Sequence, residues 1–380
     1  MAQEKIGALS DRDFTRIAAY PGGFIANFMQ HDLQPASLDL TLSDEIYEVN
    51  RNIFPYPDMT VEEMLPSMVS RRVDIDEPLW VNHKYLIKLQ QSLKLADAFK
   101  GRANPKSSMG RIDVHVRLMA DRTGAYDTVS NGYHGDLWVF VVARSFSVKL
   151  YEGMPIVNLR LFYGDPTFSA FDLDTELARQ PLLYHPDGSV IDYAKHAKTH
   201  DFMRDGSVMM TLMIPEEGYA GYRCIAPPER TLDLAKANVG QVDPQLYFDP
   251  VDVIGGGMVY MHYGAFYIFS TQESIMVPPH LAAEMVPIQP EFGSFISHLA
   301  GFFDPGWGYG KHGKGTGRPI TLETRAFLGE GVTMRRDQPV GRVTFQRMID
   351  PPEQHYDERS SNYLRQEGPK LAKWFRSWAG

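Results

Sequence analysis

The chain has 380 residues, a length that accommodates two hydrophobic cores of ordinary size. Its composition, 43% hydrophobic and 22% charged, is that of a folded globular protein and not of a disordered one. The formal net charge of −9 argues against a broad basic surface that binds polynucleotides, so no nucleic-acid polymer is expected as a partner. A small anionic ligand is compatible with this charge, because a few local Lys and Arg residues can bind phosphate.

Cysteine content and hydropathy indicate the cellular compartment in which the protein is expected. Cys224 is the single cysteine, which excludes an internal disulfide and a thiolate metal cluster and is typical of the reducing cytoplasm. The opening residues, MAQEKIGALSDRDF, contain no apolar run behind a basic segment, and no stretch approaches the roughly 20 apolar residues of a membrane span. We expect a cytoplasmic protein with no membrane partner.

Most of the periodic segments predict strands, because they are short, rich in β-branched or aromatic residues, and bounded by Gly, Pro or Asp. The clearest are LWVFVVARSFSVKL from Leu137, PIVNLRLFYG from Pro155, SVMMTLMI from Ser207 and MVYMHYGAFYIFS from Met258. The 32 glycines and 26 prolines supply the tight turns of an all-β fold. Helix is expected only near residues 61–69 and near Leu371.

The chain contains an internal repeat, which determines the number of domains more securely than length does. The first copy reads WVNHKYLIKLQQSLKLADAFKGRANP, then ADRTGAYD, then YHGDLWVFVVARSFSVKLYEGMPIVNLRLFYG. The second reads MVYMHYGAFYIFSTQESIMVPPHLAAEMVP, then AGFFDPGWGYG, then GRPITLETRAFLGEGVTMRRDQPVGRVTFQRM. We predict β domains at 1–168 and 207–350, a linker or insertion at 169–206, and a C-terminal tail at 351–380.

Two first-copy motifs carry a family resemblance. QPASLDLTLSDEIYEV, from Gln34 to Val49, resembles the opening strand signature of dCTP deaminases, and KSSMGR, from Lys106 to Arg111, resembles their RSSLAR motif. Taken alone, the first is also a plain amphipathic strand and the second a polar surface turn. Two hydroxyls, two cations and a Gly-permitted turn nevertheless suit a group of phosphate oxygens. The phosphate contacts implied are those of Lys106, Ser108 and Arg111.

The second copy carries the most specific match. AGFFDPGWG, from Ala300 to Gly308, resembles the family's AHRIDPGW signature, and the run TLETRAFLGEGVTMRRDQPVGRVTF resembles its VLEFYNSG…LRPGM-IG-LSF run. The resemblance places Glu323 on the catalytic glutamate of the family. A single Glu in a strand more often faces solvent, but the surrounding motifs favour the catalytic interpretation. One departure is Phe302, which stands where the family has the Arg of AHR.

Further nucleotide contacts are implied by the same resemblance. The run NYLRQEGPKLAKWF, from Asn362 to Phe375, resembles the family tail KYxxQxGPTPSR, which is expected to fold over the bound nucleotide. A frayed amphipathic helix would have the same composition. The nucleotide-binding residues expected in this way are Arg122 in the first-copy ADR, Asp304 in DPGW, and Tyr363, Gln366 and Lys370 in the tail.

The two copies have lost different parts of the family's site. The first-copy position of the catalytic Glu falls within Val139–Val142, which is entirely apolar, and the second-copy position of RSSLAR reads VPIQPE, Val286–Glu291. In dCTP deaminases the site lies between subunits, one contributing the Ser and Arg motif and its neighbour the Glu. We therefore expect one site shared by the two copies across a domain or subunit interface. Ala300 and Glu323 of the second copy would face four first-copy residues: Lys106, Ser107, Ser108 and Arg111.

The resemblance implies two dUTPase-like domains, each a distorted β-barrel or jelly roll with few short helices. It also implies zinc-independent deamination of dCTP to dUTP and ammonia, which supplies dUTP toward dTMP synthesis. In this mechanism Glu323 takes a proton from water and returns it to the leaving amine, while Ser107 and the Ala300 carbonyl position the water.

The metal expected in the reaction is Mg²⁺, bound to the triphosphate of the substrate. Zinc is not expected, because zinc-dependent cytidine deaminases bind the metal through H-x-E and P-C-x-x-C segments, and this chain has one cysteine. A site at His196 and His200 is disfavoured by adjacent lysines.

Two alternatives stay open. Asp304 matches the catalytic Asp of dUTPases, which share the fold. Besides a deaminase, the chain could therefore be a bifunctional enzyme that gives dUMP and pyrophosphate, or a pyrophosphatase alone. A non-catalytic nucleotide sensor is the second alternative, because a fold does not fix a function. The resemblance further implies a homo-oligomer, and dTTP as an inhibitor.

Overall fold

The computed structural model describes residues 5–18, 24–193, 195, 205–288, 295–297, 301–327, 329–359, 363 and 366–378. Packing divides the chain into two compact units. Unit 1 comprises residues 1–166, 226–243 and 372–380, and unit 2 comprises residues 167–225 and 244–371. The sequence prediction had assigned 226–243 to the second domain and 372–380 to the tail, whereas packing groups both segments with the first copy.

Unit 1 is built on one antiparallel sheet of 11 strands, with the main order β8-β10-β6-β4-β12-β7-β9. Its strands are β1 (Gly7–Ala8), β2 (Ile25–Ala26), β3 (Leu33–Gln34), β4 (Ser37–Val49), β5 (Val69–Val73), β6 (Lys84–Lys94), β7 (Phe99–Pro105), β8 (Val114–Ala120), β9 (Thr128–Val129), β10 (His134–Ala143) and β12 (Pro155–Tyr163). The apolar run of β10 is buried on both faces: Trp138 and Val139 project oppositely, and both are 0% exposed. The helices are α1 (Asp11–Ala18), α2 (Val61–Met64) and α3 (Ser107–Gly110).

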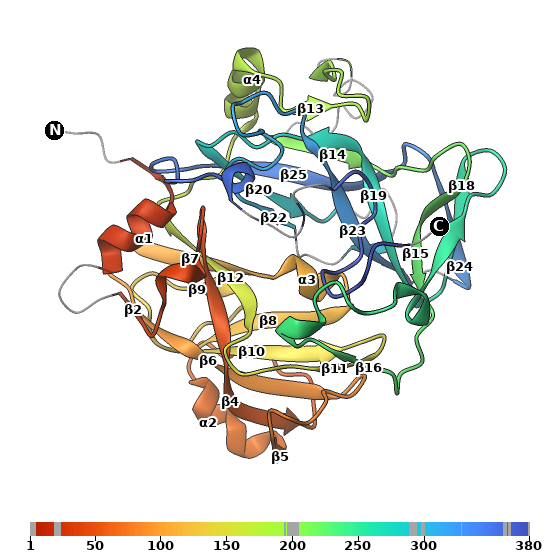
Figure 1. Cartoon of the computed structure of the whole chain (residues 1–380). Coiled ribbons are helices and arrows are strands. Elements are labelled where there is room, and N and C mark those ends of the chain that lie inside the picture. Colours follow the sequence, from red (N-terminus) through yellow and green to blue (C-terminus); the bar gives the residue numbers. More distant parts are fainter. Residues whose placement is uncertain are drawn as a thin grey trace. The chain divides into compact units, whose positions relative to one another are not determined.

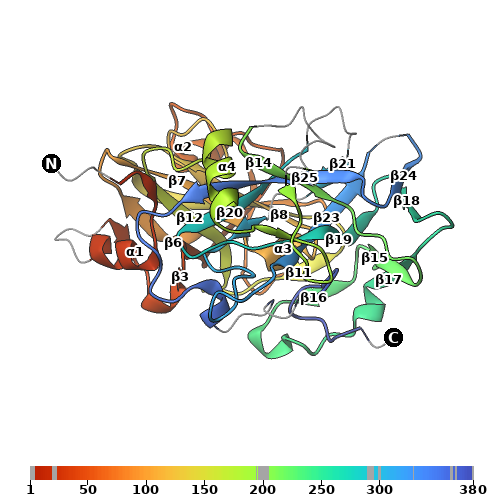
Figure 2. The same ribbon diagram turned by 90° about the horizontal axis from the view of Figure 1, so that it is seen from above.

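Residues 226–243 join unit 1 through β16 (Thr231–Asp233), which pairs in parallel with β11 (Ser147–Lys149), as Figures 1 and 2 show. The end of the chain packs on the same segment. Trp374 Nε1 donates to the Leu234 carbonyl at 3.1 Å, and Phe375 forms a β-bridge with Val242. The last described residues are therefore part of the unit 1 structure.

Unit 2 has two main sheets, ordered β17-β15-β19-β23-β21 and β14-β25-β20-β22. Its core contains side chains from both, such as Phe269 and Leu322 of the first and Val343 and Phe345 of the second. The strands are β13 (Leu183–Tyr184), β14 (Ser207–Thr211), β15 (Tyr219–Cys224), β17 (Phe248–Asp252), β18 (Met258–His262), β19 (Phe266–Ile275), β20 (Leu281–Val286), β21 (Phe295–Ser297), β22 (Phe302–Phe303), β23 (Arg318–Ala326), β24 (Gly331–Arg335) and β25 (Pro339–Arg347). The prediction of an all-β fold is confirmed.

Helix was expected only near residues 61–69 and near Leu371, so α1, α3 and a 10-residue helix of unit 2 were not predicted. α4 (Ala170–Arg179) lies in the segment predicted as a linker or insertion. Ser169 caps it by accepting the Asp172 amide, and the Asp172 carboxylate accepts the Ser169 amide in return. The S-x-x-D pattern is the sequence signal for this start, and the weak apolar periodicity of the segment concealed it.

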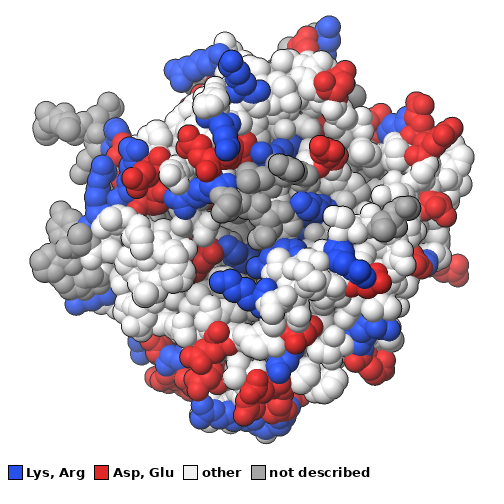
Figure 3. All heavy atoms as spheres, in the orientation of Figure 1, with Lys and Arg blue, Asp and Glu red and all other residues white. Residues whose placement is uncertain are grey.

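Two surface properties bear on partners. No helix within the described ranges is long and apolar enough to cross a membrane. Figure 3 shows Lys and Arg side chains mixed with Asp and Glu over the face that it draws.

Candidate active-site residues

The KSSMGR motif of unit 1 forms a single helical turn between β7 and β8. Lys106 occupies the N-cap position of α3 without a side-chain capping bond, and the Arg111 amide donates to the Ser107 carbonyl at 3.1 Å to close the turn. Ser107 is partly exposed, whereas Ser108 is 8% exposed and Arg111 is 4% exposed. The turn therefore brings the four expected residues together, with Lys106 and Ser107 the most accessible to a ligand.

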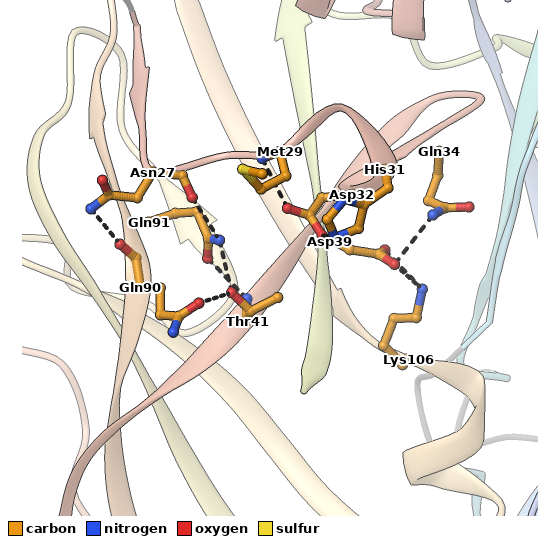
Figure 4. A network of polar contacts seen from close by, with 10 residues as sticks. All are labelled: Asn27, Met29, His31, Asp32, Gln34, Asp39, Thr41, Gln90, Gln91 and Lys106. Atoms are coloured by element: carbon orange, nitrogen blue, oxygen red, sulfur yellow. Dashed lines mark hydrogen bonds and ion pairs between the residues drawn. The ribbon is translucent and has the colours of Figure 1, made fainter. Parts of the chain in front are cut away.

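The two first-copy motifs are physically joined at Asp39, in the QPASLDL run. Lys106 Nζ lies 2.8 and 2.7 Å from the two Asp39 carboxylate oxygens, and Gln34 Nε2 donates to the same carboxylate at 3.2 Å (Figure 4). Asn158 Nδ2 adds a bond of 2.8 Å from β12. Burial raises the pKa of Asp39, and the Lys106 charge opposes the rise. The carboxylate thus holds Lys106 in place at the entrance to α3.

Two further lysines of unit 1 belong to this charged region, and sequence reasoning missed both. Burial lowers the pKa of Lys373, and the nearby charge of Lys106 lowers it further, with a smaller contribution from Lys236. Lys373 is held by its neighbour Trp374 and by its own carbonyl, which accepts the Gly240 amide at 2.9 Å. Three ammonium groups, of Lys106, Lys236 and Lys373, thus lie near two carboxylates, Asp39 and Asp32, which leaves one excess positive charge that suits an anion.

Arg122 is not part of this cluster. It is exposed, has a left-handed φ of 51°, and its amide donates to the Met59 carbonyl at 2.9 Å. β8 separates it from α3, and its 7 residues correspond to about 20 Å of extended chain. The structure therefore does not place Arg122 beside the KSSMGR turn.

Glu323 of unit 2 lies on β23 and is 4% exposed. Ile320, Leu322 and Ala326 on the same strand belong to the hydrophobic core. Because strand side chains alternate, Glu323 projects from the opposite face, together with Thr321. The carboxylate is therefore buried without being part of the apolar core.

Strand register identifies the first-copy equivalent of Glu323. Tyr267 Oη accepts the His262 amide at 2.8 Å, and Tyr85 Oη accepts the Trp80 amide at 3.0 Å with the same spacing of five residues. The residue after each tyrosine pairs with the neighbouring strand: Ile268 lies opposite Glu323, and Leu86 lies opposite Phe140. Phe140 therefore occupies the position of Glu323 in the first copy.

The first-copy face is closed by apolar side chains. Phe140 belongs to a cluster with Trp138 and Met64, and its ring stacks on Tyr126 at 6.3 Å between centroids. Residues between β4 and β5, including α2, supply much of this cluster. The Phe140 face is thus a packed hydrophobic region.

The DPGWG segment of unit 2 is a tight turn. The Trp307 amide donates to the Asp304 carbonyl at 3.1 Å, and Trp307 is packed against Phe303 and Tyr356. Gly306 has φ 90°, and a Cβ there would come within 2.4 Å of the His355 ring. Glycine is therefore required at this position, and Asp304 is held in a fixed turn, partly exposed.

The tail residues Tyr363, Gln366 and Lys370 pack within unit 2. Gln366 Nε2 donates to the Pro319 carbonyl at 2.7 Å, at the start of the strand that carries Glu323. Lys370 Nζ lies 5.8 Å from the centroid of the buried Tyr363 ring. A cavity of about 160 Å³ adjoins Gln366 and Pro319. Glu323 does not line it, so this cavity and the Glu323 face are separate features.

Some expected site residues lie outside the described residues. They are Ala300 and, among the segments considered in the sequence, the disfavoured His196 and His200 pair and the second half, 289–291, of VPIQPE. Among the residues that are described, no group of three His, Cys, Asp or Glu side chains has the arrangement of a metal site.

Family models show which protein family the chain belongs to. The family model of the dCTP deaminase N-terminal domain matches residues 5–165, and that of the C-terminal domain matches residues 188–375. The chain belongs to the dCTP deaminase family. Membership confirms the predicted resemblance and makes the chain an enzyme that acts on dCTP.

Individual dCTP deaminases resemble the chain over different lengths. The "dCTP deaminase, dUMP-forming" of Corynebacterium glutamicum is 30% identical over 141 residues, 35% of this chain and 69% of that protein. The dCTP deaminase of Natronomonas pharaonis is 28% identical over 152 residues, 37% of this chain and 73% of that protein. The crystal structure of 2′-deoxycytidine 5′-triphosphate deaminase from Agrobacterium tumefaciens is 28% identical, with a TM-score of 0.79, and the match covers 92% of this chain and 100% of that one.

Proposed function

We propose that the enzyme converts dCTP and water to dUTP and ammonia, with Glu323 as its acid and base. The observation that carries the proposal is the position of Glu323, a buried carboxylate on the face of β23 that projects away from the core. A carboxylate screened from bulk water can take a proton from a bound water and return it within the same site.

The proposed reaction balances with one carboxylate. Glu323 removes a proton from water as the water oxygen bonds to the amino-bearing ring carbon. The protonated Glu323 then gives this proton to the amine, the carbon–nitrogen bond breaks, and ammonia leaves. The second water proton ends on the neighbouring ring nitrogen. Glu323 is then an ionised carboxylate again, ready for another cycle.

The triphosphate is bound, in this proposal, by the first-copy groups. Lys106 and Ser107 are accessible on the KSSMGR turn, and Lys236 and Lys373 add charge that Asp39 alone does not balance. Mg²⁺ enters as part of the substrate, because triphosphate oxygens and water are the ligands that this ion prefers. One copy thus supplies phosphate binding, and the other supplies the base.

Product analysis tests the reaction. Purified protein is incubated with dCTP and Mg²⁺, ammonia is assayed, and the nucleotides are separated by chromatography. Equal amounts of dUTP and ammonia are expected. Binding of dCTP without ammonia release would refute the proposal and support a nucleotide sensor.

A second product has a specific observation in its favour. The relative from Corynebacterium glutamicum is named dUMP-forming, and this chain retains Asp304 in the fixed DPGW turn. If wild-type protein releases dUMP and pyrophosphate, Asp304→Asn should stop at dUTP while ammonia release continues. That result would establish the bifunctional reaction in place of the one proposed.

We expect dTTP to inhibit the enzyme by competing with dCTP for the phosphate-binding groups, because dTTP carries the same triphosphate. Inhibition assayed at several dCTP concentrations should be relieved as the dCTP concentration increases.

We also expect the protein to form a homo-oligomer. Sedimentation of the purified protein would measure its oligomeric state directly.

A further inference from the structure

Thr321 is a buried polar residue that the proposed reaction does not use. Its side chain is 7% exposed, and its Oγ1 has no hydrogen-bond partner among the residues described. A buried hydroxyl without a partner costs about 1–3 kcal/mol, and native proteins retain few of them. Within the part of the chain that the structure describes, this hydroxyl is therefore left available to hydrogen-bond a ligand.

The position of Thr321 relative to Glu323 indicates what that ligand is. The two residues are separated by one residue on β23, so their side chains project from the same face, about 7 Å apart along the strand. A pyrimidine ring that presents its amino-bearing carbon to Glu323 can present its 2-carbonyl edge to Thr321. The spacing thus fits two edges of one ring.

The hydroxyl is a feature of this chain. The family pattern VLE has Val where this sequence has Thr321. Val and Thr have almost the same shape and both favour strands, so the fold of β23 does not require the hydroxyl. A polar substitution in a buried position is therefore more informative about ligand binding than about folding.

We propose that Thr321 is a substrate-binding residue whose hydroxyl donates to the 2-carbonyl oxygen of the cytosine ring. The proposal rests on the assignment of Glu323 to the reacting carbon. The 2-carbonyl oxygen is an acceptor in both cytosine and uracil, so the contact is the same before and after the reaction. It contributes to binding of substrate and transition state alike, and its loss changes KM and leaves kcat nearly unchanged.

Two variants test the contact. Thr321→Val removes the hydroxyl and keeps the shape, and the expected result is a rise of about tenfold in KM for dCTP with kcat within twofold of wild type. Thr321→Ser keeps the hydroxyl and should retain most of the wild-type KM. The melting temperature of Thr321→Val should be equal to or above that of wild type, because the variant no longer buries an unpaired hydroxyl.

A substrate analogue identifies the atom that is contacted. In 2-thio-dCTP a sulfur, a weaker acceptor, replaces the 2-carbonyl oxygen. Wild type should prefer dCTP by about tenfold in kcat/KM, and Thr321→Val should lose most of this preference. Unchanged KM in Thr321→Val, or an equal preference for dCTP in both proteins, would overturn the inference. Absence of ammonia release by wild type would instead refute the proposed reaction.

Discussion

Phe140 and Glu323 occupy equivalent positions in the two copies of the fold. Each lies opposite the residue that follows a tyrosine whose hydroxyl accepts a backbone amide five residues earlier in the chain. One copy has an aromatic side chain where the other has a carboxylate. The two copies therefore differ at this position, and the consequence can be tested copy by copy.

Phe140→Glu should destabilise unit 1 without creating a second active site. Phe140 is 7% exposed in an apolar cluster that offers no partner for a charge. We expect a loss of at least about 3 kcal/mol in the free energy of unfolding, measured by urea denaturation. Phe140→Leu is the matched control and should lose about 1–2 kcal/mol. A stable Phe140→Glu protein with increased ammonia release would show that the first-copy face is still a site.

Lys106→Met should destabilise the protein in a pH-dependent way. Burial already raises the pKa of Asp39, and removal of the Lys106 charge, which opposes this rise, raises it further. Below the ordinary pKa of Asp, the carboxyl is neutral in both folded and unfolded states, and the variant loses little. As the pH rises above that value, the folded state must bury a carboxylate that has lost its one directly bonded cation, and the loss should reach about 3 kcal/mol at pH 7.

The measurement is urea denaturation of Lys106→Met and wild type at several pH values between 4 and 8. Lys94→Met is a suitable control, because Lys94 is exposed. A destabilisation of Lys106→Met that does not change with pH would show that Asp39 does not depend on Lys106 for its charge.

Lys373→Gln should weaken dCTP binding and spare the chemistry. We expect KM for dCTP to rise about tenfold with kcat unchanged, since a charged hydrogen bond to phosphate is worth about 1.5–3 kcal/mol. Because the pKa of Lys373 is lowered, wild-type KM should rise with alkaline pH, and Lys373→Gln should lack this rise. Lys94→Gln is the control for total charge. Equal KM values in the two variants would exclude Lys373 from phosphate binding.

Mixing two inactive variants tests how the copies share the work. Ser107→Ala damages the first-copy contribution and Glu323→Gln the second-copy contribution. If the two contributions come from different chains, a mixture that exchanges subunits should recover about a quarter of wild-type activity per site. If they come from the same chain, the mixture stays inactive, and only a single chain with both residues intact is active. Activity of either variant alone would contradict the division of labour.

The sequence predicts much of this molecule because the informative signals are local. Short apolar runs between turn residues indicate strands, and the motifs around Lys106 and Glu323 identify the family. The apolar run Val139–Val142 already shows that the first copy lacks a carboxylate at the position that matches Glu323. What it cannot show is which residue replaces Glu323, because strand register depends on pairing with β6.

The parts that the sequence does not predict depend on contacts between distant segments. Lys236 and Lys373 are separated from Lys106 by more than a hundred residues, and only packing of 226–243 and of the chain end onto unit 1 brings them together. The bond from Lys106 to Asp39 likewise joins two motifs that the sequence presents separately. The sequence shows only that Thr321 replaces the Val of the family pattern, and its burial and hydrogen bonding come from the structure.

Ammonia release by Glu323→Gln tests the central claim most directly. Glu273→Gln is the matched control, because Glu273 is equally buried at 4% exposure in the same unit and its carboxylate accepts hydrogen bonds from Thr211. We predict that Glu323→Gln binds dCTP but loses at least about 10²-fold in kcat, whereas Glu273→Gln, assayed below its melting temperature, retains its kcat. If Glu323→Gln released ammonia at the rate of the wild-type protein, that result would contradict the assignment of Glu323 as the acid and base.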